Sequence, residues 1–319
     1  MKAIIRSLTF VLLIGTTVKV AILFSIFVAG LLTPALSQAS DLRFETPNLI
    51  VIDNTRNLSD ERLRQLANHA QETLNKVLTF WSADSEIGQF GKIRVIFDTP
   101  RRRPYYVSVF YWDKENGRRV RVVRVFGSER LPQEMAHKLT TAVLPHEDKL
   151  IRNIMGVPTE EQLGNPLTFP GCGFSSDDWV LAFLRTNSLI PLNELGPDGE
   201  SWGHPIGADG LPYVSDRAKQ SKGYAEAGSF GNYLILTYGI NKIKQFYRLS
   251  FQKERPWRDI FGVGIQELEA NWLKTLQVDE KTRGENASTL SKLFERNPNT
   301  ACLEAEKLVI RKTDGTTAR

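Results

Sequence analysis

The apolar positions in the first part of the chain alternate between the spacing of strands and the spacing of a helix. Residues 60–81 repeat apolar side chains at helical spacing, behind Ser59 as a helix-capping residue and an acidic first turn. Runs rich in β-branched and aromatic residues predict strands at 48–53, 92–97, 105–112 and 118–126. The last two runs flank a segment ending in Asn116-Gly117, which is a strong hairpin signal. This order predicts a small mixed sheet with one helix packed on it.

From Leu131 onward the apolar spacing is helical. We expect helices near residues 132–143, 147–155, 176–186, 219–238, 240–251, 264–276 and 286–294. Two stretches rich in Gly and Pro, 156–173 and 192–213, predict ordered loops. A sheet followed by helices is typical of an α+β fold. We therefore expect one domain over residues 40–300, with a sheet part at 40–130, a helical part at 131–300 and a solvated C-terminal tail at 301–319.

The first 39 residues have the pattern of a targeting segment rather than of a folded domain. Basic residues at the start precede an apolar run, and small residues follow it up to Ala39. A cleaved signal peptide fits this pattern, and so does an uncleaved membrane anchor in which Lys19 is tolerated. Both predict that the segment inserts into a membrane at least transiently and that the remaining chain is exported. It would then be periplasmic, extracellular or anchored to the outer side of the plasma membrane.

Composition excludes several classes of protein. With 319 residues, 41% of them hydrophobic, and only two Cys, the chain is too apolar for disorder and too poor in Cys for a disulfide scaffold. The net charge is +5, but it falls to +2 without the basic residues of the targeting segment, Lys2, Arg6 and Lys19. Global charge therefore gives no argument for a nucleic-acid partner, and we expect none for an exported chain.

The remaining positive charge is concentrated in the predicted hairpin. Residues 101–130 hold nine basic and three acidic residues. Arginines alternate with valines along 118–126, which predicts one face on the helix and one in solvent, with Arg124 out of phase at a bulge. One interpretation is an edge hairpin that charge protects from aggregation. The other is a binding face for an anionic envelope surface, made by Arg119, Arg121 and Trp112.

Candidate chemistry centres on the predicted helix Met135–Val143. Zinc metallopeptidases of the HExxH type place two His ligands one helical turn apart, with a Glu that activates the metal-bound water. In this frame the chain reads His137-Lys138-Leu139-Thr140-Thr141. The first His is present, whereas Lys138 replaces the general base and Thr141 replaces the second ligand.

At these residues the sequence resembles the gluzincin-type, peptidase-MA-like zinc metallopeptidase domains. Ala136–Val143 is similar to their motif helix with two substitutions, and it follows a strand-helix-strand-strand block as it does in the family. Later segments resemble the helices that end such domains, among them Tyr224–Leu234 and Leu268–Leu273. The resemblance covers roughly residues 48–276 and implies a zincin-like helical part.

The resemblance also implies where a metal would be sought. The family takes its third ligand, a Glu, from a later helix, and the common spacing leads to Glu160, nineteen positions after Thr141. His146 is a further residue that could rebuild a site with His137. Because Lys138 would place a positive charge beside a Zn²⁺ ion, we expect no cofactor. Zinc held by His137, His146 and Glu160 is the alternative.

The two cysteines have two interpretations. Cys172 lies in a Gly- and Pro-rich loop and could act as a nucleophile with His137. An even count in an exported chain favours a disulfide between Cys172 and Cys302.

Together these observations predict an exported, non-catalytic, metallopeptidase-like protein that acts as a binding or scaffolding module at the cell envelope. Its partner would be a peptide, a glycan or an anionic envelope surface. The alternative is a hydrolase, either a metallopeptidase with a rebuilt site or a Cys-dependent enzyme.

Overall fold

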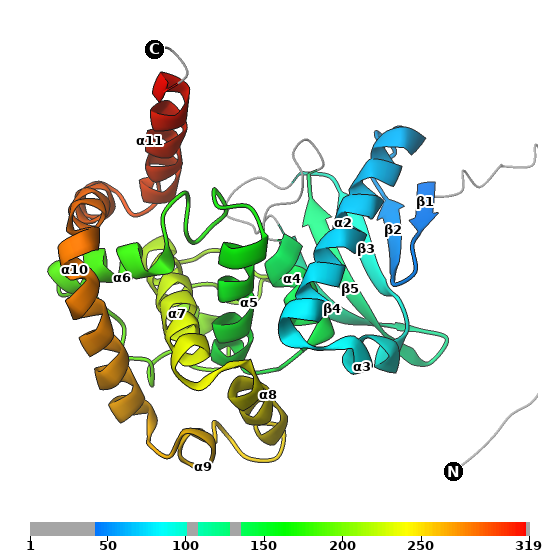
Figure 1. The fold of residues 1–319 in the computed structure, drawn as a ribbon. Helices are drawn as coiled ribbons and strands as arrows, with labels where there is room; N and C mark the ends of the chain where they lie inside the picture. The colour runs from blue at the N-terminus through cyan, green and yellow to red at the C-terminus, as the bar shows by residue number, and fades with distance from the viewer. Residues whose placement is uncertain (1–41, 101–107, 128–134, 317–319) are drawn as a thin grey trace, which may run out of the picture. The chain divides into compact units, whose positions relative to one another are not determined.

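The computed structural model describes residues 42–100, 108–127 and 135–316 (Figure 1). The chain divides into two units, Met1–Ser40 and Asp41–Arg319, and every described element belongs to the second. The predicted targeting segment lies outside the described residues. Among the helices that are described, none combines the length and apolar character needed to cross a membrane.

A mixed sheet of five strands forms the N-terminal part, as expected. Its strands lie in the order β1 (Leu42–Glu45), β2 (Leu49–Asp53), β3 (Ile93–Asp98), β5 (Arg118–Phe126) and β4 (Ser108–Glu115). The pairs β2–β3 and β3–β5 are parallel, whereas β1 and β4 pair antiparallel at the two edges. The edge strand β1 was not predicted, since its four residues are too short to show a period.

The long helix α2 (Asp60–Trp81) packs on this sheet. The Ser59 hydroxyl accepts the backbone N–H of Arg62, which confirms the predicted N-cap. At the other end of α2, the indole of Trp81 is fully buried and donates to the Thr159 hydroxyl at 2.8 Å. This bond links the sheet part to the helical part.

The hairpin β4–β5 has the predicted tight turn. Glu115 pairs with Arg118, so Asn116 and Gly117 form a two-residue turn with φ values of 49° and 77°. The pairing runs without interruption past Arg124, so the predicted bulge is absent. Arg124 instead forms an ion pair with Asp98 at 2.9 Å.

The hairpin does not present Arg121 to solvent, which corrects its assignment to a binding face. β5 is an interior strand between β3 and β4, and the Arg121 side chain is 0% exposed. Its guanidinium donates to the backbone carbonyls of Ile87 and Gly91 and to that of Ala142 in α4. Arg121 therefore joins the sheet to the helical part, because those carbonyls need a donor once they are buried.

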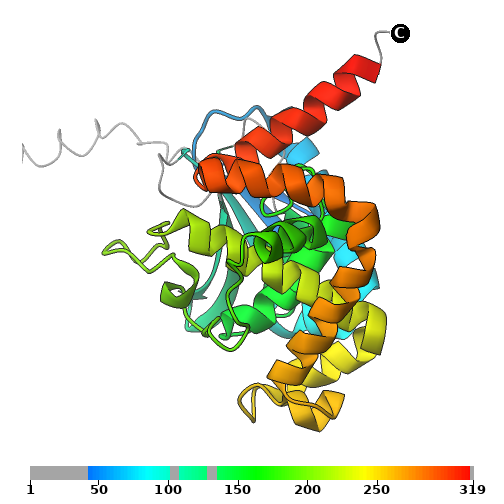
Figure 2. The same ribbon diagram turned by 90° about the vertical axis from the view of Figure 1, so that its left-hand side faces the viewer.

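The helical part follows the sheet, and with it the α+β expectation is confirmed (Figures 1 and 2). A short helix, α3 (Asp84–Ile87), follows α2 within the sheet part. The later helices are α4 (Met135–Val143), α5 (Lys149–Leu163), α6 (Ser176–Arg185), α7 (Arg217–Tyr238), α8 (Ile240–Leu249), α9 (Trp257–Phe261), α10 (Ile265–Arg296) and α11 (Ala301–Thr316). Helix α4 packs between α2 and α5, and α5 and α6 both pack on α7. Figure 2 shows α10 running past α6, on which it packs, before α11 begins.

Three helical boundaries differ from the prediction. Helix α5 continues through Gly156 and Pro158, which had been assigned to a loop, because tertiary packing compensates for these helix breakers. The two helices expected at 264–276 and 286–294 are one helix, α10, whose middle segment is polar and therefore lacks an apolar period. Residues 301–316, expected as a solvated tail, form α11.

A disulfide fixes the start of α11. Cys172 and Cys302 are joined, with their Cα atoms 5.3 Å apart. Cys172 lies in the loop before α6, inside a second apolar cluster that includes Trp179, Phe183 and Phe294. The bond thus ties two segments that are 130 residues apart in the sequence.

Candidate functional site

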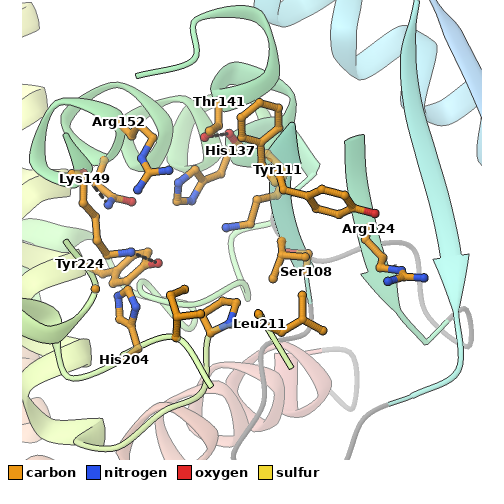
Figure 3. Close-up of a pocket in the computed structure, with 18 of the residues that line it drawn as sticks. Ser108, Tyr111, Arg124, His137, Thr141, Lys149, Arg152, His204, Leu211 and Tyr224 are labelled. Atoms are coloured by element: carbon orange, nitrogen blue, oxygen red, sulfur yellow. Dashed lines mark hydrogen bonds between the residues drawn. The ribbon is translucent and has the colours of Figure 1, made fainter. Parts of the chain in front are cut away.

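The motif helix α4 lies at one wall of a cavity of about 500 Å³. His137, Lys138 and Thr141 of α4 line it, together with residues of β4, α5, α7 and the loop 199–212 (Figure 3). The sequence places these three side chains on one helix, and the tertiary structure places the helix against the edge of the sheet. The predicted motif residues therefore all face the same cavity.

His137 is buried and uncharged. Burial lowers its pKa well below the usual range, and the positive charges of Lys138, Lys149 and Arg152 lower it further. The ring lies against the backbone of α5, where Gly156 leaves room for it: a Cβ at that position would be 2.2 Å from the ring Cδ2. A neutral imidazole among these cations is fixed in place rather than free to titrate near neutral pH.

The residues proposed as zinc ligands do not converge. Glu160 is buried on α5, and its carboxylate accepts the backbone N–H groups of His137, at 2.8 Å, and of Asn165. His146 lies elsewhere, with Nδ1 accepting the Asp148 N–H at 3.0 Å and Nε2 lying 2.9 Å from the Ser250 hydroxyl. Within the described ranges, no three His, Cys, Asp or Glu side chains form a group that could hold a metal ion. The residues present do not fit the zinc site that the resemblance implies.

A set of three basic residues, Lys138, Lys149 and Arg152, dominates the electrostatics of the cavity. We call it the cationic cluster. All three line the cavity, and all three lower the pKa of His137 and of His204 through their charge. Lys149 and Arg152 come from the first turns of α5, and no local motif in the sequence marks them. The basic character of these positions was visible in the sequence, but their position beside Lys138 depends on how α4 and α5 pack.

Aromatic side chains hold one member of the cluster. The Lys149 ammonium donates to the Tyr224 hydroxyl at 3.0 Å and lies 4.7 Å from the centre of the Tyr224 ring and 5.1 Å from that of Trp202. Such cation–π contacts compensate part of the cost of burying an ammonium group. Lys149 is thereby held at the wall of the cavity.

Arg152 is the member with the fewest contacts. Its guanidinium forms no hydrogen bond and no ion pair with the residues that the structure describes. Burial lowers the pKa of Arg152. The nearby carboxylate of Asp148 is bound instead to Arg255, at 2.6 Å. An arginine remains charged near neutral pH, so Arg152 supplies a positive charge and several N–H donors to the cavity.

A second histidine faces the cavity from the loop before α7. His204 is buried, and burial together with Lys149 lowers its pKa to about 2, so it is neutral. Tyr224 lies between the two imidazoles, with ring centres 6.1 Å from His137 and 5.8 Å from His204 (Figure 3). No local motif in the sequence indicates His204 as a cavity residue, because its position depends on the fold of the long loop.

Part of the cavity wall is apolar. A β-bridge between Ile206 and Pro212 closes the loop on itself. Both residues line the cavity, together with Leu211, and Ile206 is 64% exposed. Val109 of the edge strand β4 lines the cavity as well. The cavity thus combines cations on α4 and α5 with apolar surface on the loop and on β4.

The predicted hairpin surface is separate from this cavity. The Arg119 guanidinium lies 4.1 Å from the centre of the Trp112 ring, and neither residue lines the cavity. Arg121 is buried between the sheet and α4, so the three predicted binding residues do not form one exposed face.

In chemical terms the cavity can attract and bind an anion. Among the described residues that line it, Asp209 is the one acid, against the cationic cluster and the ion-paired Arg124. Cys172 carries no thiolate in the disulfide-bonded structure. A comparison with protein-family models, curated proteins and solved structures found no match to this chain.

Proposed function

We propose that the chain is an exported, non-catalytic binding protein with a metallopeptidase-like domain, and that its cavity binds an anionic ligand. The motif in residues 137–141 supports the relation to metallopeptidases, and the N-terminal pattern supports export. The observation that carries the proposal is the convergence of Lys138, Lys149 and Arg152 on one cavity.

Electrostatics favour this function. Three basic residues that face one cavity attract an anion between them, and an anion bound there reduces their mutual repulsion. A residue of the opposite charge, a glutamate, is what the family motif would place where Lys138 stands.

Isothermal titration calorimetry on the purified protein tests the proposal. Benzoate, phthalate and phenyl phosphate serve as anionic probes, and benzamide serves as a neutral probe of similar size. We expect at least one anion to bind with one-to-one stoichiometry while benzamide gives no heat. Replacing Arg152→Gln should weaken that binding by about tenfold, the effect of losing a charged hydrogen-bond donor.

A matched control removes a cation far from the cavity. Lys274 is exposed on α10, so Lys274→Gln should bind the anion as the wild type does. The proposal fails if none of the three anions binds. It also fails if the purified protein holds one zinc ion per chain and the His137→Ala variant holds none. That result would support a metallopeptidase instead.

A further inference from the structure

Arg152 differs from the other members of the cationic cluster in what the protein does with its charged group. No hydrogen bond and no ion pair joins its guanidinium to any residue that the structure describes, and the carboxylate of Asp148 is bound to Arg255. Lys138 and Lys149, in contrast, each interact with other groups of the chain, which for Lys149 include the Tyr224 hydroxyl. The N–H donors of Arg152 therefore remain for a ligand.

The chemistry of the guanidinium indicates which group it would bind. Burial lowers the pKa of Arg152, so its charged form is less well hydrated than in water, although an arginine stays charged near neutral pH. A charged donor that has lost part of its hydration is stabilised when a ligand supplies an acceptor. The planar guanidinium presents two parallel N–H groups, and these match the two oxygens of a carboxylate.

The wall opposite Arg152 indicates an apolar group at the other end of the ligand. Figure 3 shows Leu211 across the cavity from Arg152. Ile206 and Pro212 of the same loop also line the cavity, and we call these three residues the apolar loop wall. Ile206 is exposed, so a hydrocarbon group that covers it removes apolar surface from water.

The size of the cavity agrees with a ligand that spans it. A volume of about 500 Å³ lies in the range of sites for small organic molecules and far exceeds the space that one carboxylate group fills. The edge strand β4 contributes further apolar surface through Val109 and Phe110. A ligand that reaches from Arg152 to the apolar loop wall therefore has an anionic end and a hydrocarbon end.

We propose that the ligand is a monocarboxylate with a hydrocarbon chain, its carboxylate bound by the guanidinium of Arg152 and its chain against the apolar loop wall. This inference rests on the proposed anion-binding function and adds the class of anion. A carboxylate carries one negative charge near neutral pH, which the one guanidinium balances. The ligand stays intact, since the proposal is one of binding alone.

A series of straight-chain carboxylates tests both ends of the ligand on the wild-type protein. Calorimetry compares acetate, butyrate, hexanoate and octanoate. We expect the affinity to rise about two- to fourfold with each added methylene group, because a longer chain covers more of the apolar loop wall. Hexanamide, which has no charge, should bind at least about tenfold more weakly than hexanoate. Hexyl phosphate should bind no more tightly than hexanoate.

Variants then assign the two ends of the ligand to their walls. Arg152→Lys keeps the charge but loses the paired N–H donors, so it should weaken hexanoate by about tenfold. Ile206→Ser should weaken octanoate by about threefold and leave acetate unchanged, since only the long chain reaches the loop. Ile206 is exposed, so this variant should fold even if Arg152→Lys does not. Leu236→Ser is the control, because Leu236 is exposed on α7 and does not line the cavity.

The outcomes separate the two proposals. If the affinity for the carboxylates is the same at every chain length, the cavity binds anions but not through the apolar loop wall, and only the further inference is overturned. Tighter binding of hexyl phosphate than of hexanoate would also overturn it, because the preferred charged group would then not be a carboxylate. If none of the carboxylates and none of the other anions binds, the proposed function itself fails.

Discussion

The imidazole of His137 occupies the space in which a side chain at position 156 would have to lie. A Cβ on Gly156 would be 2.2 Å from Cδ2 and 2.7 Å from Nε2 of that ring. Both residues are buried, His137 on α4 and Gly156 on α5. Of the cationic cluster, Lys138 lies on α4, and Lys149 and Arg152 lie on α5. The contact between His137 and Gly156 therefore sets the spacing of these two helices at the cavity.

Gly156→Ala should therefore destabilise the protein, although alanine is the better helix former. The clash should cost about 1–3 kcal/mol in the free energy of unfolding, the range for an overpacked core. Urea denaturation measures this loss. Gly88→Ala is the control, because a Cβ at Gly88 would meet nothing within 4 Å.

The double variant of His137→Ala and Gly156→Ala shows whether the imidazole causes the loss of stability. With His137→Ala in the background, Gly156→Ala should cost nothing or gain up to about 1 kcal/mol from helix propensity. An equal loss in both backgrounds would show that the imidazole is not what Gly156 accommodates.

Glu226 should make stability depend on pH. Its carboxyl is fully buried on α7, accepts the backbone N–H of Ile190 at 3.0 Å, and has its pKa raised to about 8 by burial. Below pH 4.5, the ordinary pKa of a glutamate, the carboxyl is protonated in both the folded and the unfolded chain. Between 4.5 and 8 the unfolded chain releases the proton while the folded chain keeps it, so stability falls as pH rises.

Glu226→Gln should remove this dependence, because the amide resembles the neutral carboxyl at every pH. The variant should gain on the order of 2–4 kcal/mol over the wild type at pH 8 and much less at pH 5, as measured by urea denaturation at both values. Glu267→Gln, at an exposed position on α10, should follow the wild type. A gain that is the same at both pH values would show that the carboxyl of Glu226 is not protonated in the folded protein.

Arg121 and Arg119 should contribute very differently to stability, although they lie two residues apart on β5. The buried Arg121 guanidinium donates to three backbone carbonyls, and burial lowers its pKa only to about 10, so it stays charged. Arg121→Met should cost at least about 2 kcal/mol, because those carbonyls lose a charged donor. Arg119→Met should cost at most about 1 kcal/mol, the value of an exposed cation–π contact with Trp112.

Urea denaturation of the two variants checks this difference, and equal losses would contradict the buried role of Arg121. A third variant, Arg119→Glu, tests the hairpin as a surface for anionic vesicles. Binding through the hairpin should weaken in Arg119→Glu, since Arg119 is exposed. If vesicle binding is unchanged in that variant, the hairpin is no anionic-surface site.

Local signals in the sequence determined the elements that depend on neighbouring residues. Ser59 predicted the start of α2, and Asn116-Gly117 predicted the tight turn of the hairpin, because capping and turn formation involve only a few consecutive residues. The substitutions Lys138 and Thr141 in the motif were likewise visible without a structure.

Tertiary packing decided what depends on distant parts of the chain. Arg121 has the pattern of a solvent-facing residue, yet it is buried because β5 pairs on both sides and α4 covers it. Gly156 disfavours a helix, yet α5 continues through it because tertiary packing compensates, and the imidazole of His137 fills the space that a side chain at this position would take. Most important for function, Lys149 and Arg152 are ordinary basic residues in the sequence. They become members of a cationic cluster only when α5 packs on α4 and brings their charges beside Lys138.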